Sequence, residues 1–190
     1  MYLTLRRALG FAAFALVASS LGATTVVDKP HGTLAREAAL IATGQCTRLA
    51  SAWLGRELVT VATVRVDERL KGLSRSEIQV IIPGGIDVNR PVPIAMTVPG
   101  APQILPHENV LLFLAEENRV PNGYAVVGFA QGKFSLADGP GGQKMARQDL
   151  TALNLAKAAG SQPGKAQAFT LEQIRQEIHD ALAAPESENK

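Results

Sequence analysis

His107 and Glu108 are the first residues of this chain to suggest catalytic chemistry, because His-Glu opens the helical zinc motif of metalloproteases. That motif needs a second histidine four residues after the first, and Leu111 stands there instead. The other histidines, His31 and His179, lie on separate segments, and a single cysteine completes no zinc-ligand spacing. The sequence therefore predicts no metal site and no cofactor.

The other catalytic patterns are also incomplete. Residues 128–133 and 160–165 each place one residue too few before Gly-Lys for a phosphate-binding loop, and no Gly-x-Ser-x-Gly elbow occurs. Asp67 and Glu68 are neighbours on an expected strand, so their side chains point to opposite faces. No catalytic residue is assigned from these patterns.

Four polar residues remain as a candidate enzymatic site. His107 and Glu108 precede one predicted strand, and Gln131 and Lys133 lie on the next. Adjacent strands would bring the four side chains together. One hypothesis is therefore a hydrolase-type enzyme assembled from these residues.

The elements that would position such a site are mainly β-strands, which we expect at Leu40–Trp53, Leu58–Leu70, Ile78–Ile82, Val110–Leu114 and Tyr124–Leu136. In the second segment, odd positions change from apolar Val59 and Val61 to polar side chains from Thr63 onward, whereas one apolar face is formed by the even positions Leu58, Ala62, Val64, Val66 and Leu70. This pattern is typical of a strand that is covered on both faces at one end only. The predicted fold is mainly β, a small antiparallel barrel (OB-like) or a sandwich, with a C-terminal α-helix.

We place the β-barrel domain at residues 24–142, and it contains a long loop over residues 83–106. Prolines punctuate this loop, and because proline cannot donate to a central ladder it holds at most an edge strand at Ile94–Val98. Loops of this length are uncommon unless they are functional or disordered. The loop is therefore the first place to look for a binding surface.

The C-terminal part differs in kind. Residues 143–168 are expected to be a linker, and residues 169–184 an amphipathic helix with an apolar stripe. Thr170 and Gln173 are spaced as a capping box at its start. The helix either docks on its own barrel or serves as a tethered, partner-binding helix.

Residues 1–23 have the layout of a secretory signal peptide, with Arg6 and Arg7 before an apolar run over Ala8–Ala18 and small residues after it. Cleavage is expected after Gly22 or Ala23, which predicts a periplasmic or secreted protein with no membrane span after cleavage. The chain has 19 basic and 17 acidic residues, and two arginines leave with the signal peptide, so 17 of each remain. This neutral balance predicts no nucleic-acid partner.

Cys46 is the only cysteine, so the chain can form no internal disulfide. It shares strand phase with Leu40, Ala42 and Gly44, which favours a small buried hydrophobic residue. The alternative is a reactive or intermolecular thiol.

Several short motifs follow one another in a recognisable order: Leu70-Lys71-Gly72, Pro83-Gly84-Gly85, Pro99-Gly100-Ala101-Pro102, His107-Glu108 and Gln131-Gly132-Lys133-Phe134. This order resembles a set of uncharacterised exported bacterial proteins, over roughly residues 38–137 plus the final helix. The resemblance implies no established activity. The candidate binding residues are Lys71, Gly84, Gly85, Pro99, Gly100, His107, Glu108, Gln131 and Lys133.

The order of strands and turns is also similar to netrin-like modules and tissue inhibitors of metalloproteinases, which implies a five-stranded OB barrel. Inhibitors of that type use an amino-terminal cysteine on the protease zinc. The mature chain is expected to begin near Ala23 or Thr24 without one. The resemblance therefore does not extend to their mechanism.

The leading functional hypothesis is an exported, non-enzymatic binding module of the cell envelope. Its partner would be another envelope or secreted protein, with a protease among the candidates, and its surfaces would be Gly84–Pro106 and the helix stripe. The alternatives are the hydrolase described above and a structural envelope component.

Overall fold

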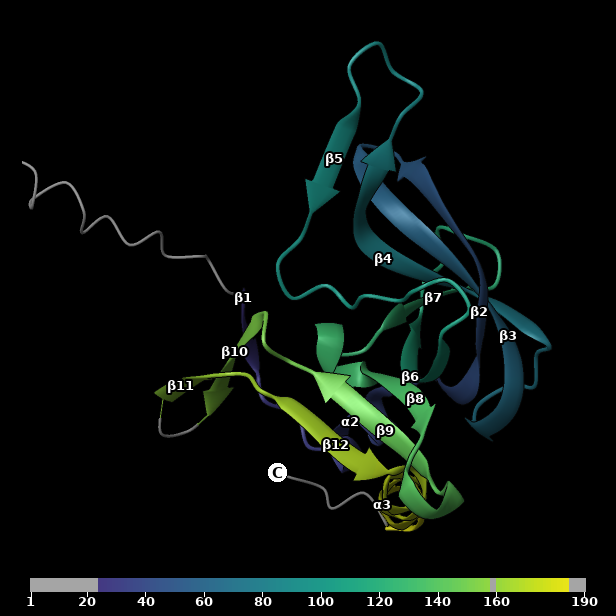
Figure 1. Cartoon of the computed structure of the whole chain (residues 1–190), viewed down its shortest axis with the longest axis vertical. Helices are drawn as coiled ribbons and strands as arrows, with labels where there is room; N and C mark the ends of the chain where they lie inside the picture. Colours follow the sequence, from purple (N-terminus) through teal and green to yellow (C-terminus); the bar gives the residue numbers. More distant parts are fainter. Residues whose placement is uncertain (1–23, 158–159, 185–190) are drawn as a thin grey trace, which may run out of the picture.

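The computed structural model describes residues 24–157 and 160–184, and the predicted signal peptide over residues 1–23 lies outside this part (Figure 1). The fold is mainly β, with 55% of residues in strands and 17% helical, and it ends in an α-helix as predicted. In the residues described, no helix combines the length and apolar character needed to cross a membrane.

Five strands close into a ring in the order β6, β2, β3, β4, β7 and back to β6. Their bounds are β2 (Leu40–Leu54), β3 (Glu57–Lys71), β4 (Glu77–Asp87), β6 (Asn109–Glu116) and β7 (Gly123–Val126). All pairs are antiparallel except β4 with β7. Five is the strand number of an OB barrel, and the OB-like assignment stays a prediction.

The ring encloses the first hydrophobic core. Its fully buried members include Leu40, Cys46, Ala62 and Val64, which confirms the predicted inward phase of β2 and β3. Val59 on the opposite face of β3 is also buried, whereas Arg65 is exposed. The strand is thus covered on both faces at its start and solvated on one face further on, as its pattern predicted.

A second core lies on the outer face of β6, where Leu111 and Phe113 pack under two helices, α2 (His31–Glu37) and α3 (Leu171–Ala183). The Val110–Leu114 run is buried on both faces, as expected. Thr170 and Gln173 form the predicted capping box. Helix α3 is docked on the sheet through Ile174 and Ile178 rather than tethered.

Further strands extend the ring. The sheet continues from β6 through β8 (Lys133–Asp138) and β9 (Lys144–Asp149) to β12 (Ala166–Thr170). A separate three-stranded sheet contains β1 (Thr24–Val27), β10 (Leu153–Lys157) and β11 (Gly160–Pro163).

The predicted linker over residues 143–168 is therefore wrong, as is the end of the β-domain at residue 142. The missed strands are four to six residues long and rich in Gln, Ala and charged residues, so backbone pairing forms them without strong apolar alternation. The glycines before residue 143 instead form η2 (Pro140–Gly142), the turn between β8 and β9.

The predicted strand Tyr124–Leu136 is in fact two strands. A 3-10 turn, η1 (Phe129–Gly132), separates β7 from β8. The chain bends where Gly128 and Phe129 both take positive φ, 68° and 60°. A glycine inside a strand pattern often marks a bend, and here the strand breaks completely.

Cys46 provides a test of the ring core. Its side chain is fully buried, and burial raises the pKa of its thiol. We expect the native protein to resist a thiol reagent such as dithionitrobenzoate at neutral pH and to release one equivalent in concentrated guanidinium chloride. Rapid labelling of the native chain would contradict the buried position.

Candidate functional site

Residues 84–97, here called the arm, project from the ring (Figure 1). β4 pairs with β7 through residues 79–81 and with β5 (Ile94–Thr97) through residues 84–87. β5 pairs with no other described strand, which confirms the predicted edge strand. Gly84 has φ +94°, and a Cβ there would lie 2.6 Å from the Met96 carbonyl oxygen. Only glycine allows this approach without strain.

The arm is fastened to the β2–β3 hairpin by polar contacts. The Trp53 indole donates a hydrogen bond to Asp87 Oδ2 at 2.8 Å, and the Arg90 guanidinium lies 4.8 Å from the Trp53 ring centroid. Arg90 Nε also contacts Asp87 at 3.0 Å. These contacts hold the pKa of the Asp87 carboxyl below its usual value, chiefly through the hydrogen bond from Trp53.

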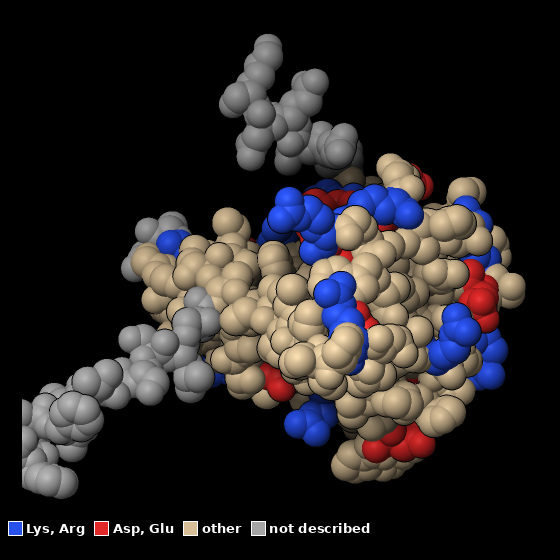
Figure 2. Space-filling model, turned by 90° about the horizontal axis from the view of Figure 1, so that it is seen from above, with Lys and Arg blue, Asp and Glu red and all other residues tan. Residues whose placement is uncertain are grey.

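Exposed apolar side chains are concentrated on the arm and its continuation. Ten large apolar side chains are exposed in the part of the chain described, and five of them lie within residues 83–106: Ile86, Val88, Val92, Met96 and Leu105. Viewed from above, the surface is largely uncharged, and the charged side chains lie mainly toward its margins (Figure 2). Such concentration is typical of an interaction surface rather than of scattered surface residues.

An apolar hollow of about 390 Å³ lies at the base of the arm. Its floor includes Val59, Ile81 and Ala125, one residue from each of three adjacent strands. Residues of opposite phase on the same three strands, Ala62, Val80 and Tyr124, fill the ring core. The hollow therefore lies against the outer face of the barrel wall, and ligand sites of this size and character are common in proteins.

Phe129 stands at the side of this hollow, with Met96 and Val98. Its φ of 60° is in the left-handed region, which costs a residue with a side chain about 1–2 kcal/mol. The turn is held by the next amide, Ala130 N–H, which donates to the Gly100 carbonyl at 3.1 Å. Strained residues cluster at ligand-binding positions, and the Phe129 side chain is 37% exposed.

Two carboxylates and one guanidinium line another part of the hollow. Arg119 Nη1 donates to Glu57 Oε2 at 2.6 Å, and Arg119 Nη2 donates to Glu117 Oε2 at 2.9 Å. The hydrogen bonds from Arg119 hold the pKa of Glu117 below its usual value. Two carboxylates beside one guanidinium give this part of the hollow a formal charge of −1.

A second hollow, of about 270 Å³, contains part of the polar quartet. Lys133 Nζ lies 2.6 Å from Glu108 Oε1 and donates to Ser135 Oγ at 2.7 Å, and the Lys133 and Glu108 side chains are each only 13% exposed. Asp149 lines the same hollow, and its pKa is lowered chiefly by hydrogen bonds from Thr151. Ser135 had no signal in the sequence that set it apart.

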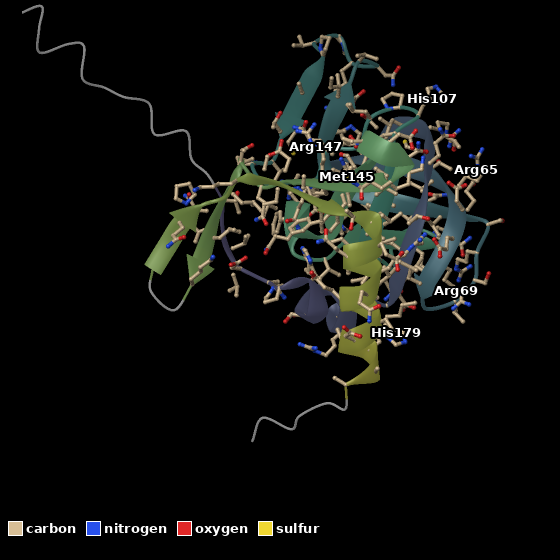
Figure 3. All side chains as sticks on the ribbon, turned by 60° about the horizontal axis from the view of Figure 1, so that its bottom comes forward. Arg65, Arg69, His107, Met145, Arg147 and His179 are labelled. Atoms are coloured by element: carbon tan, nitrogen blue, oxygen red, sulfur yellow. The ribbon has the colours of Figure 1, made fainter. Side chains whose placement is uncertain are left out.

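The other two members of the quartet lie apart from this pair. His107 is exposed, with φ 62°, and points outward at the surface (Figure 3). The Gln131 side chain is buried and donates to the Val27 and Gly128 carbonyls at 3.0 and 3.2 Å. The four residues therefore do not converge into one site.

The other candidate binding residues predicted from the sequence make contacts within the fold. Lys71 donates to the Ala35 and Arg36 carbonyls at 2.8 and 2.9 Å, in the last turn of α2, and burial lowers its pKa. A Cβ on Gly85 would meet Ser51 and Thr60, and one on Gly100 would meet Leu153 at 2.3 Å. The Pro99 carbonyl accepts a hydrogen bond from the Thr24 hydroxyl at 2.6 Å. Of the candidate binding residues Gly84, Gly85, Pro99 and Gly100, only Gly84 lines the apolar hollow.

The Glu108–Lys133 pair yields a stability prediction. Lys133→Met should lower the free energy of unfolding by about 3 kcal/mol, because the mostly buried Glu108 carboxylate loses its cationic partner and retains only the hydrogen bond from the Leu105 amide. Glu108→Leu combined with Lys133→Met should recover most of the loss, as measured by urea unfolding. Equal losses for the double and the single variant would show that the ion pair is not the cause.

The arm yields a pH prediction. Because the pKa of Asp87 is lowered, its contacts with Trp53 and Arg90 are intact at neutral pH and are lost only as pH falls through that lowered pKa. Trp53 is the single tryptophan, so its fluorescence emission should change with acid titration below the ordinary aspartate range. Asp87→Asn should abolish this transition while the far-ultraviolet circular dichroism is kept. An identical titration in the variant would remove Asp87 as its source.

Comparison with known protein families, curated proteins and solved structures gives no match for this chain. In residues 24–157 and 160–184, no three His, Cys, Asp or Glu side chains are grouped so that they could hold a metal ion. The apolar hollow and the arm above it are therefore the candidate binding site on geometry alone.

Proposed function

We propose that this chain is an exported, non-enzymatic module that binds another envelope or secreted protein through the arm and the apolar hollow. The observation that carries the proposal is the gathering of five exposed large apolar side chains within residues 83–106, one of which, Met96, also lines the open apolar hollow. Exposed apolar area is unfavourable in water and becomes favourable when a partner covers it.

The rest of the molecule supports this choice of surface. The apolar stripe of α3 is used within the fold, because Leu171, Ile174 and Ile178 are buried in the second core. The helix face that could have bound a partner is thus largely occupied. The arm alone holds four of the ten exposed large apolar side chains in the described residues.

The hollow adds features of a binding site to the exposed surface. Phe129 is kept in a strained conformation beside it, and three strands of the ring form a rigid floor. Rigid, preformed sites lose little conformational entropy when they bind. In this proposal the arm supplies the exposed apolar area that a partner covers, and the hollow supplies the specificity.

Photo-cross-linking tests the proposal with a matched control. A benzoylphenylalanine at Val88 of the full chain, expressed in its own cells, should cross-link to one discrete protein, because the arm is the binding surface. The same residue at Leu73 should not, although Leu73 is as exposed as Val88, at 69% and 68%. Leu73 lies next to the opposite end of β4 from the arm. Equal cross-linking at both positions, or none at Val88, would contradict the proposal.

A further inference from the structure

β5 presents an exposed strand edge. It pairs with β4 alone, so the backbone groups on its outer side have no partner strand in the described fold. Exposed edges are normally protected by charged residues, proline or a bulge. The four residues of β5, Ile-Ala-Met-Thr, contain neither a charge nor a proline. An edge of this kind is suited to pairing with another extended chain.

The edge and the hollow are continuous. Met96 belongs to β5, and Val98 is the first residue after this strand. Both residues line the hollow. A chain that runs along the outer edge of β5 therefore passes the mouth of the hollow. Side chains alternate along a strand, so this chain would direct one side chain in two toward the molecule, where a volume of about 390 Å³ can take one large apolar group.

The charges beside the hollow indicate which kind of partner side chain should lie next to the apolar one. Glu57 and Glu117 share one guanidinium, that of Arg119, and the side chain of Glu57 is 66% exposed. The charged residues on the arm balance each other, because Arg90 is paired with Asp87. A basic side chain next to the apolar one would neutralise the excess carboxylate, whereas an acidic one would add to it.

We infer that the partner contributes an extended segment that adds as a strand to the outer edge of β5, places a large apolar side chain in the hollow and sets a Lys or Arg against Glu57 and Glu117. This inference rests on the proposed function and specifies its ligand. Backbone hydrogen bonds to β5 supply a sequence-independent part of the affinity, and the hollow and its carboxylates supply the specificity.

Selection from a random peptide library displayed on phage, with the purified exported chain as target, tests the inference. The selected sequences should alternate apolar and polar residues and carry a basic residue beside a large apolar one. A synthetic selected peptide should bind in a fluorescence anisotropy titration. N-methylation of every second backbone amide, on the edge that faces β5, should weaken binding by at least about tenfold, because it removes the pairing donors.

Two variants with the same added volume separate the hollow from the rest of the surface. Ala125→Leu fills the hollow and should weaken the peptide by about tenfold or more, whereas Ala137→Leu, at an exposed position on β8, should leave affinity unchanged. Glu57→Gln should remove part of the preference for the basic residue. Circular dichroism and urea unfolding establish that both leucine variants are folded.

Several results would overturn the inference. These are selected peptides that bind as amphipathic helices, a peptide indifferent to N-methylation, or a peptide indifferent to Ala125→Leu. Sedimentation showing that the chain dimerises through β5 would also overturn it, because a second copy would then occupy the edge. If these results accompany a specific cross-link at Val88, the proposed function stands and only the strand-addition mode fails. If the Val88 cross-link is absent as well, both fail.

Discussion

The structure depends on how β4 changes partners along its length. Residues 79–81 pair with β7 and complete the ring, and residues 84–87 pair with β5 and build the arm. Between these pairings lies Pro83, which has no amide to donate. Gly84 begins the second pairing, and its missing Cβ lets the Met96 carbonyl approach. β4 thus runs without a break from the barrel wall into the arm. The hollow is the space that remains where the two pairings meet, and for this reason both ring and arm residues line it.

A buried polar network holds the strained side of the hollow in place. The Gln131 side chain accepts the Lys29 amide at 2.8 Å and donates to the Val27 and Gly128 carbonyls, so it joins the end of β1 to the turn before Phe129. Its own carbonyl accepts a hydrogen bond from Gln148 at 2.6 Å. A buried amide with all these partners rigidifies its surroundings. The left-handed backbone at Phe129 persists because η1 is fixed from both sides.

The sequence predicted what hydrophobic alternation and capping chemistry specify. β2 and β3, the two-faced burial at Val59, the buried run in β6 and the capping box of α3 all followed from residue spacing. Strands β9 to β12 did not, because they are short and lack regular apolar alternation, so backbone pairing with neighbouring strands forms them. The hollow was missed for a similar reason. Val59, Ile81 and Ala125 become neighbours only through β-sheet register, and nothing local marks Phe129 for positive φ.

The arm also has to be stiff if it is to serve as a binding surface. A flexible apolar loop would have to lose conformational entropy on binding, and it would expose its side chains to unspecific contacts. Here Pro91 and Pro93 restrict the connection between β4 and β5, and the Trp53–Asp87–Arg90 contacts fasten its end to the β2–β3 hairpin. The chain has no internal disulfide to contribute, because Cys46 is its only cysteine and lies in the core. Backbone pairing and these side-chain contacts therefore provide the preorganisation that a strand-binding edge requires.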